Sequence, residues 1–368
     1  MAASMNRQIF EYKQPFTLTL DGSLPGFQLA YEVWGRLNRG ATNAILLFPG
    51  LSASAHAKSH DKGDVPGWWE AMIGPGEALD TEHYFIVCIN HLGGCFGSTG
   101  PGSLNPGTGK PYGADFPPIL MQDMVDAVRL LVEHLGIAGV FCTVGASMGG
   151  MLAMEYAARF SGSVANMIMI SASGRPGPQS IAYRYVQRQV ILNDPYFNGG
   201  NYYDHPERLR KSMAVARQIG NITYRSHHEF NARFGRGRTG HGYNFGPDFQ
   251  VESYLHHMGH KLGSNFDANS FLVLSKSMDH YSLGYEFPSY ETGVARIEAR
   301  CLVVGVSSDI LFPIEEQHDV YKILHKLGRN VRFKRLESTS GHDAFLVEVD
   351  FFKNTIKRFL EAYESKRG

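Results

Sequence analysis

A serine set between small residues is the first feature of this 368-residue chain that points to covalent chemistry. The segment Gly145-Ala146-Ser147-Met148-Gly149 follows an apolar run and opens a stretch of helical character. In that setting the pattern Gly-x-Ser-x-Gly predicts a nucleophile elbow, a tight strand-to-helix turn that presents a hydroxyl at a helix N-terminus. A serine that merely caps a helix is the alternative at this position. We expect Ser147 to act as a nucleophile.

A serine nucleophile requires a base and an acid that orients the base, and two late residues have the right types and order. Asp309 follows the apolar run Cys301–Val306, and His342 follows the run Val331–Leu336. If both runs are parallel strands, their carboxyl ends lie at one sheet edge, beside Ser147. We therefore predict a triad in which His342 removes the Ser147 proton and Asp309 fixes the imidazole.

Negative charge that develops on an attacked carbonyl oxygen must be stabilised by hydrogen-bond donors. The backbone N–H of Met148, directly after the serine, is the first predicted donor of this oxyanion hole. The second is the N–H of Leu51, in the loop that follows the apolar run Ala44–Phe48.

Alternating strand and helix patterns surround these residues and predict a mostly parallel α/β sheet flanked by helices. The expected strands are Phe16–Leu20, Gln28–Val33, Ala44–Phe48, Tyr84–Asn90, Val140–Val144, Met167–Ile170, Cys301–Val306 and Val331–Leu336. The expected helices are Met121–Leu135, a helix from the elbow to about Phe160, Ile314–Leu327 and Val349–Tyr363.

The alternation stops between residues 174 and 292, where the chain is polar and helical, with a glycine-rich loop at Gly235–Pro247. A helical block inserted between two halves of one sheet predicts a cap over the carboxyl edge of that sheet. The expected organisation is a core of residues 1–173 and 293–368 with a cap, or lid, of residues 174–292.

Composition excludes several classes of function. The 35 Lys and Arg residues balance 35 Asp and Glu residues, so the basic surplus of a nucleic-acid-binding protein is missing. No run of about 18 apolar residues suggests a membrane span, and Met1–Gln14 does not resemble a secretion signal. The four cysteines form no Cys-x-x-Cys pair. We therefore expect a reducing, cytoplasmic environment without disulfides.

One helical segment could bring metal ligands together, because Glu252, His256 and His260 follow one another at intervals of four residues. Such histidines are more often partly exposed helix residues, and the predicted triad needs no metal. We expect neither a metal nor any other permanently bound cofactor.

Longer motifs resemble the homoserine O-acetyltransferase family, from about Tyr31 to Phe359. The matching segments are Pro66-Gly67-Trp68-Trp69, Asn90-His91-Leu92-Gly93-Gly94-Cys95, Gly97-Ser98-Thr99-Gly100-Pro101, Ser103-Leu104-Asn105-Pro106, Gly109-Lys110-Pro111-Tyr112-Gly113, Asp115-Phe116-Pro117, the elbow, Thr223-Tyr224-Arg225-Ser226, Phe266-Asp267-Ala268-Asn269-Ser270 and Gly341-His342-Asp343. The resemblance implies an α/β-hydrolase fold with a lid and transfer of an acyl group from acyl-CoA, the co-substrate, to a small hydroxy amino acid. It also implies a homodimer and a place in methionine or cysteine biosynthesis.

The same resemblance implies three substrate-binding residues. Arg217 and Tyr224 would hold the carboxylate of the amino acid, and Asp343 would hold its ammonium group. These pairings suit the charges, since a guanidinium matches a carboxylate and a carboxylate matches an ammonium.

The substrates themselves stay open, because the family includes members that use homoserine or serine as acceptor and acetyl-CoA or succinyl-CoA as donor. Homoserine with acetyl-CoA is the default expectation. Segments 171–176 and 180–184, Gly50-Leu51-Ser52 and 252–255 resemble the serine-acylating or succinylating members more closely. Arg175 and Arg184 are candidates for contacting a succinyl carboxylate. Two further functions stay open on the same fold: a serine esterase or thioesterase with this triad, and a binding protein whose triad is inactive.

Overall fold

A mostly parallel sheet runs through the computed structural model, which describes residues 6–240, 245–263 and 266–364. The strands are β1 (Gln8–Tyr12), β2 (Phe16–Thr17), β3 (Ser23–Leu24), β4 (Phe27–Trp34), β5 (Ala44–Phe48), β6 (Ile73–Gly74), β7 (Leu79–Asp80), β8 (Phe85–Ile89), β9 (Val140–Ala146), β10 (Val164–Ile170), β11 (Arg300–Val306) and β12 (Val331–Leu336). Eight of them form the main sheet in the order β1-β4-β8-β5-β9-β10-β11-β12. β4 pairs antiparallel with β1 and β8, and the neighbours from β8 to β12 are parallel.

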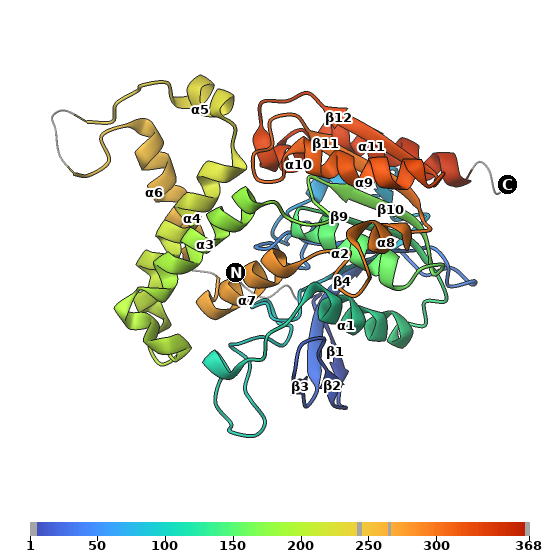
Figure 1. Cartoon of the computed structure of the whole chain (residues 1–368), viewed down its shortest axis with the longest axis horizontal. Coiled ribbons are helices and arrows are strands. Elements are labelled where there is room, and N and C mark those ends of the chain that lie inside the picture. The colour runs from blue at the N-terminus through green and yellow to red at the C-terminus, as the bar shows by residue number, and fades with distance from the viewer. Residues whose placement is uncertain (1–5, 241–244, 264–265, 365–368) are drawn as a thin grey trace.

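Helices flank the sheet and form a separate group beside it (Figure 1). They are α1 (Met121–His134), α2 (Met148–Arg159), α3 (Pro178–Leu192), α4 (Arg210–Tyr224), α5 (His227–Phe234), α6 (Gln250–Gly263), α7 (Ala268–His280), α8 (Tyr290–Ala295), α9 (Ile314–Lys326), α10 (Ala344–Val347) and α11 (Val349–Glu364). Among these elements, no helix has both the length and the apolar character that crossing a membrane requires.

Both faces of the sheet are buried, which explains why its central strands are continuously apolar. Successive residues of a strand point to opposite faces, so Leu46 packs in the core layer beneath α1, α2 and α9. Leu47 packs in the other layer, against α11 and the segment between β5 and β8. Helices on both faces of a mostly parallel sheet are the arrangement that the sequence predicts.

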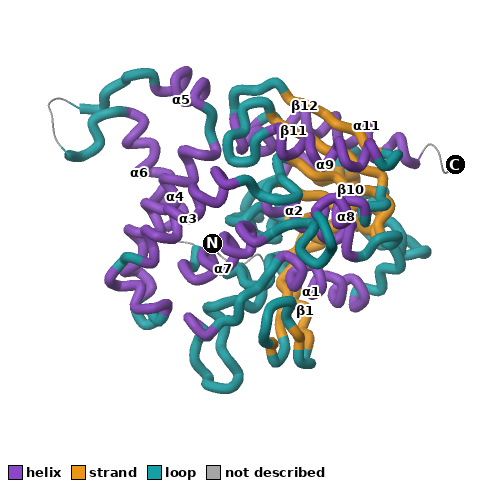
Figure 2. The backbone as a smooth tube through the Cα atoms, in the orientation of Figure 1, coloured by secondary structure: helices purple, strands orange, loops and turns teal. Residues whose placement is uncertain are grey.

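The segment expected to form the cap is helical and stands to one side of the sheet (Figures 1 and 2). Within it α3 packs against α4 and α7, and α4 packs against α6. Residues 241–244 of the expected glycine-rich loop lie outside the described residues. The expected cap boundary at residue 292 falls within α8, a helix that packs on α2 and α9 of the core.

Two elements near the N-terminus differ from the sequence-based prediction. Residues 8–12 form β1, an added antiparallel strand that pairs with β4. The expected strand Phe16–Leu20 is reduced to Phe16–Thr17, because Thr19 donates through its backbone N–H and its hydroxyl to the Asp123 carboxylate. A side chain of α1 thus replaces the neighbouring strand as hydrogen-bond partner.

Candidate active site

Ser147 occupies a strained turn between β9 and α2. Its φ of 58° and ψ of −127° lie in a backbone region that residues other than glycine rarely adopt. Its N–H donates to the carbonyl of Ile170 at 2.9 Å, which ties the turn to the neighbouring strand. A Cβ at Gly145 would lie 2.2 Å from the Gly149 carbonyl oxygen, and one at Gly149 would lie 2.0 Å from that of Phe48. The two glycines are therefore required by close backbone approach.

Asp309 and His342, which follow β11 and β12 respectively, form a pair, and His342 lines the same cleft as Ser147. His342 Nδ1 lies 2.8 Å from Asp309 Oδ2, and both side chains are buried. The other carboxylate oxygen, Oδ1, accepts the N–H groups of Leu311 at 2.9 Å and Phe312 at 3.0 Å. The acid is thus held by the backbone that follows it and is oriented toward the imidazole.

The electrostatic environment favours the charged form of His342. Burial lowers the pKa of this imidazole, but the charge and hydrogen bond of Asp309, helped by the charge of Asp343, outweigh burial and raise it above its ordinary 6.5. A histidine stabilised as an imidazolium suits a group that must take up a proton during the reaction.

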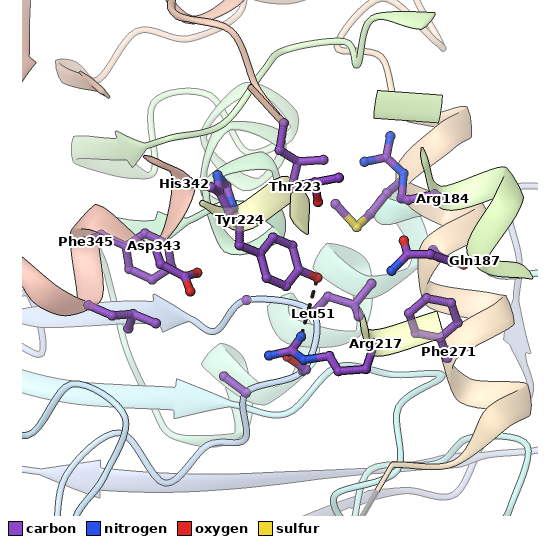
Figure 3. Close-up of a pocket in the computed structure, with 18 of the residues that line it drawn as sticks. Leu51, Arg184, Gln187, Arg217, Thr223, Tyr224, Phe271, His342, Asp343 and Phe345 are labelled. Carbon is purple, nitrogen blue, oxygen red and sulfur yellow. Dashed lines mark hydrogen bonds between the residues drawn. The ribbon is translucent and has the colours of Figure 1, made fainter. Parts of the chain in front are cut away.

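A cleft joins these residues to the cap. From the core it is lined by residues 50–53, Trp68, Ser147 and His342. From the cap it is lined by side chains of α3, α4 and α7, which include Arg184, Gln187, Arg217, Tyr224 and Phe271. Figure 3 shows His342 and Asp343 on one side of this cleft and Arg184 and Gln187 on the other, with Tyr224 between them. A substrate at Ser147 would therefore be in contact with the cap.

The two predicted oxyanion donors lie at different depths. Leu51 lines the cleft. Met148 is fully buried and is the first residue of α2, where a backbone N–H has no acceptor within its own helix.

The three predicted substrate residues all line this cleft. Arg217 Nη1 is 3.5 Å from both the Tyr224 hydroxyl and Ser52 Oγ, and the guanidinium lies over the Tyr224 ring. Asp343 Oδ2 is already 3.3 Å from Arg225 Nη2. Any ammonium group at Asp343 would therefore share the carboxylate with a guanidinium.

Comparison with known proteins points to one family. A family model described as the alpha/beta hydrolase fold matches residues 43–349. The chain is 43% identical over 362 residues to a homoserine O-acetyltransferase from Symbiobacterium thermophilum, covering 97% of this chain and 94% of that protein. It is 44% identical over 356 residues to a serine O-succinyltransferase from Stenotrophomonas maltophilia, covering 95% of each.

Solved structures of similar fold include a homoserine O-acetyltransferase and an esterase. A homoserine O-acetyltransferase from Bacillus anthracis superposes with a TM-score of 0.89 at 26% identity, covering 96% of this chain and 97% of that one. Esterase E22 superposes with the same TM-score and identity, covering 96% and 99%. The chain belongs to the homoserine O-acetyltransferase family of α/β-hydrolase-fold O-acyltransferases.

The two arginines considered for an acyl carboxylate have different positions in this family member. Arg175 lies over the Tyr290 ring at 4.2 Å and is not among the residues that line the cleft. Arg184 lines the cleft and is buried, and neither its Nη1 nor its Nη2 has a hydrogen-bond partner among the described residues. Of these two arginines, Arg184 is the one that lines the cleft.

Sequence reasoning did not find the acid that holds Arg184. Asp279 of α7 accepts Arg184 Nε at 2.6 Å through Oδ1 and Arg188 Nη2 through Oδ2. Two guanidinium groups thus share one carboxylate, and burial lowers the pKa of Arg184 despite that partner. The spacing of Arg184 and Arg188 on one helical face was the only available signal, since Asp279 lies more than 90 residues away.

Gln187, which also lines the cleft, was missed as well, although it lies one helical turn from Arg184.

The three residues of α6 that were considered as metal ligands do not converge on one point. Glu252 accepts the N–H groups of Asp248 and Phe249 at the start of the helix, whereas His256 and His260 lie 3.3 Å apart, both exposed.

Proposed function

We propose that this protein transfers a succinyl group from succinyl-CoA to the side-chain hydroxyl of L-serine. The observation that carries the choice of donor is the buried, partly unpaired guanidinium of Arg184 in the same cleft as Ser147. The cluster of Arg184, Arg188 and Asp279 has one positive charge more than it has negative charges. A succinyl carboxylate would neutralise that excess charge and accept hydrogen bonds from the unpaired Nη1 and Nη2 of Arg184. An acetyl group has no charged atom that could do so.

The proposed first half-reaction acylates the enzyme. Ser147 Oγ attacks the thioester carbonyl while His342 takes the hydroxyl proton, with Asp309 stabilising the imidazolium. The N–H groups of Leu51 and Met148 stabilise the carbonyl oxygen as it becomes negative. Collapse of the intermediate breaks the C–S bond, His342 returns the proton to the leaving sulfur, and CoA departs as the thiol.

The proposed second half-reaction passes the acyl group to the amino acid. Arg217 and Tyr224 bind its carboxylate, and Asp343 binds its ammonium group beside Arg225. His342 then removes the proton of the acceptor hydroxyl, whose oxygen attacks the acyl-serine ester. Breaking the bond to Ser147 Oγ, with proton return from His342, releases the O-acyl amino acid and restores the enzyme.

Serine is the proposed acceptor because a relative that is 44% identical to this chain is a serine O-succinyltransferase. A homoserine O-acetyltransferase is the second candidate, since a relative of that name is 43% identical to this chain. The likeness to esterase E22 keeps hydrolysis of the acyl-enzyme as a third outcome. The zwitterion-binding pair of Arg217 and Asp343 favours transfer, because water as acceptor would need neither residue.

One matrix of assays tests the proposal. The protein is mixed with acetyl-CoA or succinyl-CoA, each alone and each with L-serine or L-homoserine, and release of free thiol is followed. We expect the highest kcat/KM with succinyl-CoA and serine. Faster reaction with acetyl-CoA and homoserine would support the second candidate, and equal thiol release without any amino acid would support hydrolysis.

Intact-mass measurement isolates the first half-reaction. Succinyl-CoA without acceptor should leave a covalent succinyl adduct on the protein, and the Ser147→Ala variant should show none. The same adduct on Ser147→Ala would remove Ser147 from its proposed role.

The assembly and location predicted from the sequence also stay proposals. The four cysteines are unpaired, and three of them are buried, which fits a reducing cytoplasm. Sedimentation of the purified protein tests the homodimer directly.

A further inference from the structure

A carboxylate and two imidazoles are gathered on the sheet face that α11 covers, outside the substrate cleft. Glu32 of β4 is 1% exposed and shares its face with Trp34, because residues two apart on a strand point the same way. His56 and His60 come from the loop after β5. None of these three residues lines the cleft around Ser147. Their grouping is therefore not explained by acyl transfer.

The two imidazoles converge on one oxygen atom. Glu32 Oε2 lies 2.9 Å from His56 Nδ1 and 2.9 Å from His60 Nε2. The three atoms that could bind a metal lie within 4.8 Å of one another. No Lys or Arg among the described residues forms an ion pair with Glu32, so the two histidines are its charge partners.

The hydrogen bonds of His56 require a cation, either a proton or a metal ion, between its ring and the Glu32 carboxylate. His56 Nε2 lies 2.6 Å from the Val65 carbonyl oxygen, which can only accept, so Nε2 carries a proton. In a neutral imidazole the other nitrogen, Nδ1, then presents a lone pair to Glu32 Oε2. Two acceptors at 2.9 Å repel each other. Either an extra proton or a metal cation must therefore lie between them.

The loop that carries both histidines is held in place by other contacts. Glu70 accepts the Ser59 and Gly67 N–H groups at 2.9 and 2.7 Å and the Ser59 hydroxyl at 2.6 Å. Asp64 Oδ2 accepts the N–H of His60 at 3.1 Å. The His60 ring also stacks on Trp34, with centroids 4.9 Å apart and planes 11° apart. The ligand atoms are thus positioned before any metal binds.

We propose that Glu32, His56 and His60 form a zinc site that ties the loop after β5 to β4. Two imidazoles and one carboxylate are ligands that zinc accepts, and the two nitrogens argue against magnesium or calcium. Ligand bonds of about 2.0–2.2 Å around tetrahedral zinc separate any two ligand atoms by about 3.3–3.4 Å. Each nitrogen would therefore move a few tenths of an ångström away from Glu32 Oε2, and the two nitrogens, which lie within 4.8 Å of one another, would take up the same spacing. The Val65 carbonyl supplies the outer hydrogen bond that orients a zinc-bound histidine.

The fourth ligand of this site is water. The side chains of His56 and His60 are 16% and 17% exposed, so solvent reaches the imidazoles, whereas the Glu32 side chain is 2% exposed. The loop stabilised by the metal also contributes residues 50–53 and Trp68 to the substrate cleft. Zinc would therefore fix one wall of the active site without contacting the substrate.

Calorimetric titration of chelator-treated full-length protein with zinc chloride tests the site. We expect one tight zinc ion per chain, a rise in the thermal midpoint with zinc, and a change in tryptophan fluorescence because Trp34 stacks on His60. His60→Gln and His56→Gln should each lower the zinc affinity by more than about 100-fold, since loss of a residue that only hydrogen-bonds a metal ligand costs about 10–100-fold. Unchanged affinity in both variants would overturn the proposal.

The exposed histidine pair of α6 provides the matched control. His256→Gln removes one imidazole of that pair and should leave the tight site intact. Loss of the tight site in His256→Gln alone would place zinc on α6 and refute the Glu32 site. X-ray absorption of the zinc-loaded wild-type protein needs no variant to fold. It should show nitrogen and oxygen ligands with an imidazole pattern, and a sulfur ligand would contradict the proposal.

Discussion

Asp309 uses its two carboxylate oxygens for different partners, with Oδ2 bonded to His342 Nδ1 and Oδ1 bonded to the backbone N–H groups of Leu311 and Phe312. The backbone donors prevent the carboxylate from rotating away from the imidazole. This single residue therefore sets both the ring orientation and the tautomer that a base toward Ser147 requires.

Replacing Asp309 by Asn should preserve the fold but impair the base. The amide can still accept from the backbone, yet it presents no negative charge to stabilise the imidazolium. We expect the acylation rate to fall by about 10⁴-fold, as for loss of the acid in other triads. Stopped-flow thiol release with succinyl-CoA measures it, and a loss below tenfold would show that Asp309 is not the orienting acid.

The pH dependence of acylation should reflect the raised pKa of His342. Only the neutral imidazole can accept the Ser147 proton, so kcat/KM for acyl-CoA should fall as the pH drops through that pKa. Since Asp309 and Asp343 raise the pKa, the midpoint should lie above 6.5, and Asp343→Asn should move it downward. A wild-type midpoint at or below 6.5 would contradict this environment.

Arg184→Gln should change the preference between acyl donors. Without the guanidinium, kcat/KM for succinyl-CoA should fall by about 10–100-fold, in line with loss of a charge-assisted hydrogen bond, while that for acetyl-CoA changes little. Arg175→Gln is the matched control, because Arg175 lies over the Tyr290 ring and does not line the cleft. Equal losses with both donors in Arg184→Gln would indicate a structural role.

Arg217→Ala should separate the two half-reactions. If Arg217 binds the amino-acid carboxylate, the KM for serine should rise by at least about tenfold while formation of the acyl-enzyme is nearly unchanged. Arg210→Ala, an exposed position of the same helix, controls for general effects on α4. If the Arg217→Ala change slowed formation of the acyl-enzyme as much as it raised the KM for serine, the assignment would be refuted.

Glu155 of α2 should make the protein less stable as the pH rises. Burial raises the pKa of this carboxyl from 4.5 to about 8. The folded protein therefore keeps a proton that the unfolded chain has lost. Between about pH 5 and 8 the free energy of unfolding should decrease with pH, by about 1.4 kcal/mol per unit at most for this group.

Glu155→Gln, which resembles the protonated acid, should remove this decrease. Urea unfolding of both proteins at several pH values measures the difference. Glu133→Gln on the exposed face of α1 serves as the surface control, since the Glu133 side chain is 54% exposed. A parallel pH dependence in wild type and Glu155→Gln would exclude Glu155 as its source.

Features that arise within a short stretch of chain could be predicted from the sequence. The helix Met121–Leu135 and the strands Ala44–Phe48 and Val331–Leu336 agree with the structure within one residue, because hydrophobic periodicity is local. The elbow followed from Gly145 and Gly149, since only small residues fit there. Strand β1 was not predicted, because pairing with β4 rather than its own pattern makes it a strand.

The candidate site divides in the same way. The types and order of Ser147, Asp309 and His342 predicted a triad, and the strand ends that carry them determine one common edge. The sequence did not distinguish Arg184 from Arg175, because which guanidinium reaches the cleft depends on how the cap packs on the sheet. Asp279, which holds Arg184 from a different helix, depends on the same packing.

The Glu32, His56 and His60 cluster shows most clearly what only the tertiary structure decided. The two histidines lie 24 and 28 positions after Glu32, so the sequence does not show that the carboxylate meets them. They meet because β4 is buried under the loop after β5, which brings a strand carboxylate against two loop imidazoles. The sequence by itself indicated the candidate nucleophile, the alternation of strands and helices, and the family. Folding decided which charges face one another, because that depends on contacts between residues distant along the chain.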